Sequence, residues 1–450
     1  MSLIFNLPIL LCVIIYLSAN YYPMAHLLKN TFLKQSSIYL FSNILNALIP
    51  FILLPFFSQY LDTEAYGKIA IFQLIITGLG AIIGLNTVGA ASRYYFEKSS
   101  FRQKILYNNS GFSILIYSTI FILITSLIFS HSLTYFFNIP THWIILAIVN
   151  SFGLFIIQFR LTYFQIKNNA LKYSIYQVGN SIVNFILTII LISKFNLGED
   201  GRVYSILIST FLFSALSLIS LFRENLISFL YKKHKYIKNN LSFGLPLLPH
   251  VFGVFLLSSI DRFYISKYFD LSTAGIYMMA FQVSMGLLLV FDAMNKAFTP
   301  FLFRTLSSIT EKDKNKIVKI SYFLFIFCIV IGFISYLVSP ILLVFFIGEK
   351  YVKSSQIVNL LCIGQTFQGL YLVITNYIFY AKKTLYLSFV TIFSGFFNMI
   401  LLVMLVPEYG LIGASISFCI SMAIRFIFTW FVSYKVYPMP WFSFLKKKNR

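Results

Sequence analysis

The chain has 450 residues, of which 59% are hydrophobic and only 11% are charged, and its mean hydropathy is +0.83. A water-soluble domain of this length does not need so much apolar surface, so the composition excludes an ordinary soluble protein. Apolar runs of about 20 residues, the length that crosses about 30 Å of hydrocarbon, recur along the whole chain. The sequence therefore predicts a multi-pass membrane protein without a separate soluble domain.

We predict an all-α integral membrane protein with about twelve transmembrane helices. Lipid cannot satisfy open backbone groups, and the continuous apolar runs lack the alternation of a β-barrel. The first six predicted spans are 36–58, 69–91, 111–130, 143–166, 173–193 and 203–222. The second six are 241–265, 274–298, 317–338, 355–380, 385–406 and 411–433.

Residues 1–23 form an apolar extension before the first span. The segment from Met1 to Tyr22 carries no charge, so it lacks the basic region of a secretory signal. Met24, followed by Lys29 and Lys34, resembles a cytoplasmic start of translation. Two alternatives therefore stay open: the extension is translated, or the start codon is wrongly assigned.

The orientation follows from the basic residues. Of the 35 lysines and arginines, about three quarters lie on one set of alternate connections. The positive-inside rule makes this side cytoplasmic, so both ends of the helical bundle face the cytosol. The net charge of +22 is then explained by the basic cytoplasmic connections, which favour contact with anionic lipids. A nucleic-acid partner is not needed to explain it.

An internal repeat divides the chain into two halves. The pattern Ser-x-Tyr-x-Asp that ends at Asp62, followed by Gly67, recurs as the pattern that ends at Asp270, followed by Gly275. Both copies join the first and second helix of a six-helix set. Weaker echoes pair Glu199 and Gly201 with Glu408 and Gly410, and Asn184 with Asn398. Because six is even, the two halves run in parallel through the membrane.

We therefore predict two parallel six-helix lobes around a central cavity. Residues 24–222 form the N-lobe with the first six helices, and residues 241–433 form the C-lobe with the last six. Residues 223–240 are predicted as a basic cytoplasmic linker and residues 434–450 as a basic cytoplasmic tail.

Three short segments carry a family resemblance: Leu28–Phe32, Phe243–His250 and Ser259–Arg262. Together with the two lobes, they resemble Wzx-type O-antigen and capsular polysaccharide flippases, in the polysaccharide branch of the multidrug/oligosaccharidyl-lipid/polysaccharide exporter superfamily. The resemblance implies a V-shaped transporter of the bacterial inner membrane, not an enzyme. It would move undecaprenyl-pyrophosphate-linked repeat units from the cytoplasmic to the periplasmic leaflet.

The same resemblance implies coupling to a proton or sodium gradient and no other cofactor. Besides the lipid-linked glycan and membrane lipids, the implied partners are a polysaccharide polymerase and a chain-length regulator. No Walker loop is visible, which argues against direct use of ATP. The four cysteines show no paired spacing and the five histidines are scattered, so we predict neither a disulfide nor a metal site.

Five ionisable residues within the spans are the main site candidates. A charge near the membrane centre costs about 2.5–3.5 kcal/mol, so it normally faces a polar cavity or a partner. Arg262, Lys296 and Arg425 are candidates for attracting a diphosphate or an acidic sugar. Asp261 and Asp292 would pair with them or carry a coupled proton. Asp292 and Lys296 lie four residues apart and could simply neutralise each other, and Arg425 could serve packing alone.

Further polar residues lie in the first four spans. Arg93 and Arg160 lie near the inner ends of their helices, so their charges can reach the membrane interface along an extended side chain and need no cavity. Arg93 is nevertheless kept as a cavity candidate. Asn43 and Asn46 in the first span, and Gln73 and Asn86 in the second, could bind sugar hydroxyls. The alternative is bonding between helices, worth about 0.6 kcal/mol each.

The seventh predicted helix contains residues typical of a hinge. Pro246 and Pro249 each remove a backbone donor, and Gly244 and Gly253 flank them. This pattern suits bending during alternating access. Kinked packing without motion is the alternative.

Three other functions are weighed against the flippase. A membrane-bound O-antigen polymerase would need a long outer loop, and the longest here runs only from His131 to His142. A multidrug-cation exporter would favour acids in its cavity, whereas the spans hold more cations. A lipid II flippase usually has two further helices, which this chain lacks after Ser433.

The predicted topology can be tested with reporter fusions. A reporter fused after Lys235 is expected to be cytoplasmic, and one fused after Asp270 is expected to be periplasmic, because an odd number of spans separates the two sites. Paired activity of alkaline phosphatase and a cytoplasmic reporter measures this. Reversal at either site would contradict the helix count.

Overall fold

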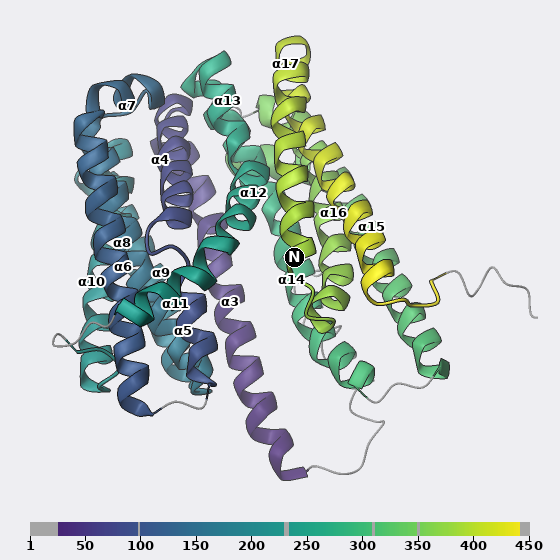
Figure 1. Cartoon of the computed structure of the whole chain (residues 1–450). Coiled ribbons are helices and arrows are strands. Elements are labelled where there is room, and N and C mark those ends of the chain that lie inside the picture. Colours follow the sequence, from purple (N-terminus) through teal and green to yellow (C-terminus); the bar gives the residue numbers. More distant parts are fainter. Residues whose placement is uncertain (1–25, 98–99, 229–233, 308–310, 349–351, 442–450) are drawn as a thin grey trace, which may run out of the picture.

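The computed structural model describes residues 26–97, 100–228, 234–307, 311–348 and 352–441, and all regular structure in this part of the chain is helical. The predicted extension 1–23 and most of the predicted tail lie outside the described residues. Two groups of helices stand side by side, and α12 and α13 lie between them (Figure 1).

The first group contains the N-lobe helices. They are α3 (His26–Tyr60), α4 (Thr63–Ile82), α5 (Thr87–Tyr95), α6 (Phe101–Ile128), α7 (Ser130–Phe137), α8 (Thr141–Ile166), α9 (Ala170–Ile189), which continues as the π-helix η1 (Ile190–Lys194), and α10 (Gly198–Arg223). The remaining helices are α11 (His234–Gly244), the 3-10 helix η2 (Leu245–Leu247), α12 (Leu248–Ser258), α13 (Ile260–Tyr268), α14 (Leu271–Ser307), α15 (Glu311–Ile347), α16 (Val352–Tyr380) and α17 (Leu385–Val436).

The described residues contain 11 helices that are long and apolar enough to cross a membrane. The last of these, α17, has 52 residues and would be about 78 Å long if straight, far more than one crossing requires. It bends at Gly410, whose φ of 59° and ψ of −135° are not helical, three residues after Pro407. The helix therefore accounts for two crossings, which gives the predicted twelve.

The second predicted span, 69–91, was wrong as one continuous helix. It breaks into α4 and α5, and Gly84, Leu85 and Asn86 all have positive φ values between them. A Cβ atom on Gly244 would lie 2.0 Å from the Leu85 carbonyl oxygen, so the turn packs directly against backbone. Hydropathy does not register this break, because a window of about 19 residues averages the short turn with the apolar helices on either side.

The seventh crossing belongs to both helical groups. Its first part, α11, packs against α5 and α6 in the N-lobe, whereas α12 packs along α17. The short 3-10 helix η2 lies between them. Pro246 and Pro249 occupy the first turn of η2 and of α12, where a missing N–H sacrifices no helical hydrogen bond. Thus the predicted hinge prolines lie where the chain passes from one lobe to the other.

The repeated sequence forms matching helix starts. The Asp62 carboxylate accepts a hydrogen bond of 2.7 Å from Ala65 N at the start of α4. The Asp270 carboxylate accepts one of 2.6 Å from Thr273 N at the start of α14. The two aspartates therefore cap equivalent helices in the two lobes.

The two repeated turns also contact each other. A Cβ atom on Gly67 would lie 1.8 Å from the Leu271 carbonyl oxygen, and one on Gly275 would lie 2.1 Å from the Thr63 carbonyl oxygen. The hydroxyl oxygens of Thr63 and Ser272 are 2.5 Å apart. We call this end of the molecule the turn end. We call the opposite end, where α5 and α10 finish with Arg93 and Arg223 in their last turns, the basic end. Because glycine has no side chain, each of these two positions allows the backbone of the other lobe to approach closely.

We expect Gly67→Ala to separate the lobes at the turn end. The methyl group would have to move from 1.8 Å to about 3.5 Å from the carbonyl oxygen, so the lobes should part by about 2 Å or more. Spin labels at Asn138 and Tyr409 would report the distance by double electron–electron resonance. Gly80→Ala on the same helix is the control, because its Cβ would meet nothing within 4 Å. An unchanged distance in Gly67→Ala would refute the role of this contact.

Candidate functional site

Asp261 and Arg262 begin α13, and both are buried. The Asp261 carboxylate accepts hydrogen bonds from Tyr277 Oη at 2.7 Å and from the backbone N of Arg262 at 2.8 Å. Arg262 donates through Nη1 to the Ser258 carbonyl at 2.8 Å, and its guanidinium lies 4.2 Å from the centre of the Phe281 ring. The two charges are therefore held by different partners inside the C-lobe.

Arg425 has a similar environment on α17. It donates through Nη1 to Gln368 Oε1 at 2.9 Å, and its guanidinium lies 3.9 Å from the centre of the Tyr371 ring. The Nε atoms of Arg425 and Arg262 are buried and have no hydrogen-bond partner. Each guanidinium thus retains a donor that protein atoms leave unused.

Asp292 and Lys296 form an ion pair on α14, with 2.5 Å between Oδ2 and Nζ. Their side chains are 44% and 42% exposed, which distinguishes them from the buried charges above. The pairing that the spacing allowed is confirmed. The pair lies on the C-lobe helix that packs most extensively against α4 of the N-lobe.

Arg93 is exposed at the end of α5. Its Nε is 3.9 Å from a Glu97 carboxylate oxygen, and its guanidinium lies 5.5 Å from the centre of the Phe243 ring on α11. This position matches a side chain that extends toward the interface. The structure thus places Arg93 apart from the buried arginines.

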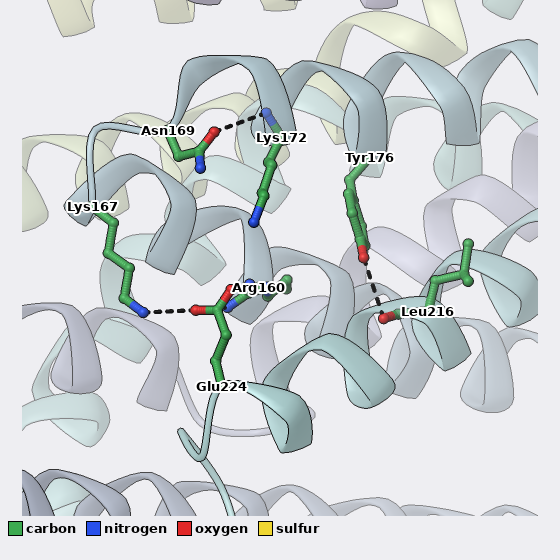
Figure 2. A network of polar contacts seen from close by, with 7 residues as sticks. All are labelled: Arg160, Lys167, Asn169, Lys172, Tyr176, Leu216 and Glu224. Carbon is green, nitrogen blue, oxygen red and sulfur yellow. Dashed lines mark hydrogen bonds and ion pairs between the residues drawn. The ribbon is translucent and has the colours of Figure 1, made fainter.

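Arg160 contradicts the expectation of a side chain that reaches the interface. It is completely buried, forms a two-pronged ion pair with Glu224 after the end of α10, and stacks 4.0 Å from the centre of the Phe164 ring. Lys167 Nζ contacts the other side of the same carboxylate at 2.6 Å. Figure 2 shows Glu224 between the two cations. Because Glu224 lies 64 positions away in the sequence, only the fold could reveal the partner.

The partners of Glu224 control its titration. Partial burial acts to raise the pKa, but hydrogen bonds from Arg160 and Lys167 outweigh it and lower the pKa from 4.5 to about 2. A lowered pKa means that the stabilisation is complete above the ordinary value and disappears as the pH falls from 4.5 toward 2.

Glu224→Gln is therefore expected to destabilise the protein by about 2–3 kcal/mol, because it leaves the buried Arg160 without a counterion. Lys167→Met is the matched control and should cost no more than about 1 kcal/mol, since that cation is partly exposed. Thermal unfolding in detergent as a function of pH measures both. The Gln variant should also lack the loss of stability between pH 4.5 and 2 that Glu224 contributes to the unmodified protein. Equal stability of the two variants would contradict the interpretation.

Arg202 was missed as a buried cation because the sixth predicted span begins only at residue 203. In the structure α10 already begins at Gly198, so Arg202 lies within a helix. It donates through Nη1 to Asn184 Oδ1 at 2.6 Å and to Thr188 Oγ1 at 2.8 Å. The acidic pair Glu199 and Asp200, typical of a first helical turn, was the available signal.

The predicted amide candidates surround the interior of the N-lobe. Asn43 Oδ1 accepts a hydrogen bond of 3.2 Å from Gln177 Nε2, and Asn46 Oδ1 accepts one from the Ser181 hydroxyl, so both link α3 to α9. Gln73 is half-buried on α4. Asn46 also lines a cavity of about 730 Å³ bounded by α3, α4, α5, α8 and α9.

Twelve crossings in two parallel lobes, one crossing shared between them and charges buried in both lobes define a two-lobed membrane protein. The chain belongs to the family described as polysaccharide biosynthesis protein, whose sequence profile matches residues 32–306. This match confirms the family resemblance seen in the sequence.

Similar proteins agree with this assignment. The "Lsg locus putative protein 1" of Haemophilus influenzae is 27% identical over 399 residues, which cover 85% of this chain and 94% of the relative. The fold is similar to that of a Vibrio cholerae MATE transporter, VcmN, with a TM-score of 0.61 and 17% identity over 90% of this chain and 96% of that one. An inward-facing multidrug resistance MATE family transporter of the MOP superfamily gives a TM-score of 0.64 and 17% identity, covering 92% and 96%.

Proposed function

We propose that this protein is a flippase of the bacterial inner membrane that moves undecaprenyl-pyrophosphate-linked oligosaccharides from the cytoplasmic to the periplasmic leaflet. The observation that carries the proposal is the match to the polysaccharide biosynthesis family over residues 32–306, on a fold shared with MATE transporters. Polysaccharide assembly from membrane-bound precursors requires a step that carries a polar glycan across hydrocarbon. A two-lobed membrane protein is suited to that step.

The physical task is to move a diphosphate and several sugars while the isoprenoid tail remains in lipid. Arg262 and Arg425 are proposed as attracting groups in the C-lobe, where each keeps a buried Nε–H without a protein partner, as Arg160 and Arg202 do in the N-lobe. A phosphate oxygen is a strong acceptor for such a donor. Lys296 would add a third cation once its pair with Asp292 opens.

The proposed orientation places the basic end in the cytoplasm and the turn end in the periplasm. The reciprocal glycine contacts then lie on the outer side and hold the lobes together there. Such a conformation favours loading from the cytoplasm, in line with the similarity to an inward-facing transporter. Release would require the turn end to open.

We extend the proposal to energy coupling by a proton or sodium gradient. Asp292 is the better candidate for a coupled proton, because its side chain is 44% exposed whereas Asp261 is buried beneath Tyr277. A polysaccharide polymerase and a chain-length regulator would act on the flipped product.

Deletion of the gene tests the function. The expected result is loss of surface polysaccharide and accumulation of glycan-bearing carrier lipid, measured by immunoblotting and mass spectrometry, with recovery when the gene is returned. Susceptibility to cationic drugs should stay unchanged. Normal polysaccharide in the deletion strain would refute the proposal, and raised susceptibility would favour a multidrug-cation exporter instead.

Variants in the same complementation assay test the cationic site. Arg262→Ala is expected to reduce polysaccharide per inserted molecule at least about tenfold, and Arg262→Lys should retain part of it, because the charge remains although the planar fork is lost. Lys194→Ala, an exposed cation at the end of η1, is the control and should be neutral. Normal output per molecule in Arg262→Ala would remove Arg262 from the substrate site.

A further inference from the structure

The N-lobe contains a cavity beside the break between α4 and α5. Residues of the turn, including Asn86, and of the start of α5 form one wall, and α8 and α9 form the opposite one. Leu85 and Asn86 both have left-handed φ values, of 45° and 55°. Strain of this kind is retained where a particular shape is needed. The volume of about 730 Å³ falls in the range of about 300–1,000 Å³ typical of small-molecule sites.

The lining is polar and uncharged. Its polar part consists of amide and hydroxyl side chains, namely Asn46, Asn86, Ser92, Ser151, Gln158, Thr162, Gln177 and Asn180. None of the described residues that line the cavity has an ionisable side chain. This distinguishes the lining of the N-lobe cavity from the C-lobe site that contains Arg262 and Arg425.

Two of the lining amides present acceptors that the protein does not use. Gln177 Oε1 and Asn180 Oδ1 are buried and have no hydrogen-bond partner. An unpartnered buried carbonyl is costly, so a hydrogen-bond donor from a ligand bound in the cavity would stabilise each of these two side chains. Both residues lie on α9, one helical turn apart, and so present their acceptors on the same side of the helix.

The chemistry of the lining selects among ligands. An acyl chain would leave the amides unpaired, and an organic cation or an acidic sugar would find no opposite charge. An uncharged sugar supplies hydroxyl donors to the carbonyl groups and accepts from the amide N–H groups. Its C–H faces can contact apolar residues of α8 that also line the cavity, such as Phe155 and Leu161.

We propose that the N-lobe cavity is a binding site for uncharged sugar residues of the transported glycan, with Gln177 and Asn180 as hydroxyl acceptors. The inference rests on the proposed flippase function and adds a division of labour to it. Sugars bind in the N-lobe, while the diphosphate is attracted by the arginines of the C-lobe.

Occupancy of the cavity can be measured by the rate at which an introduced cysteine is labelled. The cell's own lipid-linked glycan serves as the ligand. Gly80 lines the cavity, and its Cβ direction is open, so Gly80→Cys adds a thiol without removing an amide. The variant is made in a chain whose native cysteines are replaced by alanine, and it is labelled in cells by a membrane-permeant maleimide. Cells that lack the first glycosyltransferase of the pathway provide the glycan-free state.

Labelling is expected to be about fivefold slower in cells that make the glycan, which corresponds to a site that is occupied most of the time. Adding Asn180→Leu should abolish this protection, whereas adding Asn150→Leu should preserve it. Asn150 is the matched control because its buried amide also lacks partners but does not line the cavity. Equal labelling in both cell types, or protection that survives Asn180→Leu, would overturn the proposal.

The readout separates this inference from the flippase function. A chain that exports glycan normally but shows no glycan-dependent protection keeps the function and refutes the site. If the glycan protects the thiol from labelling but deletion of the gene leaves surface polysaccharide normal, the sugar site is supported and the flippase function is refuted.

Discussion

A charge within hydrocarbon must be satisfied by another part of the chain, and this requirement fixes the helices inside each lobe. Arg160 is completely buried and reaches Glu224, so it joins α8 to the end of α10. Arg202 joins α10 to α9 through Asn184 and Thr188. Loss of either set of partners would leave a cation in low dielectric, so neighbouring helices cannot move apart independently. The constraint ties α8, α9 and α10 of the N-lobe together.

The contact between the lobes has the opposite character. Glycines and backbone carbonyls meet at the turn end, and the Thr63 and Ser272 hydroxyls add a hydrogen bond between neutral groups. Nearby, Phe263 of α13 packs against Phe136 and Phe137 of α7. These contacts can break without leaving a buried charge unpaired. The chain thus combines strong polar links within the N-lobe with a weaker, close-packed interface, as rigid-body motion between the lobes requires.

The sequence predicts those features that depend on neighbouring residues. Apolar length is local, so the positions of the crossings could be predicted, and the Asp62 and Asp270 caps act within three residues. The partner of Arg160 could not be predicted, because 64 positions separate it from Glu224. The break before α5 was missed because apolar length averages over a short turn, although Gly84 and Asn86 are residue types that favour turns. The N-lobe cavity combines residues of five helices, so it could not be predicted as a cavity, although Asn46 in its lining was predicted as a sugar contact.

The seventh crossing connects the wall of the N-lobe cavity to the C-lobe. Because α11 packs on the N-lobe and α12 on α17, any rotation between the lobes must be absorbed near η2, where Pro246 and Pro249 have already removed backbone donors. Gly244 contacts the turn at Leu85, which leads into the wall of the N-lobe cavity, and Gly253 contacts Ile392 on α17. Bending at η2 would therefore act on the cavity wall through one glycine and on the C-lobe through the other. A substrate whose sugars bind in one lobe and whose diphosphate binds in the other would thus bind best at one particular angle of this hinge. A ligand can shift a conformational equilibrium only by binding one conformation more tightly than the other, and this dependence on the hinge angle would supply that difference.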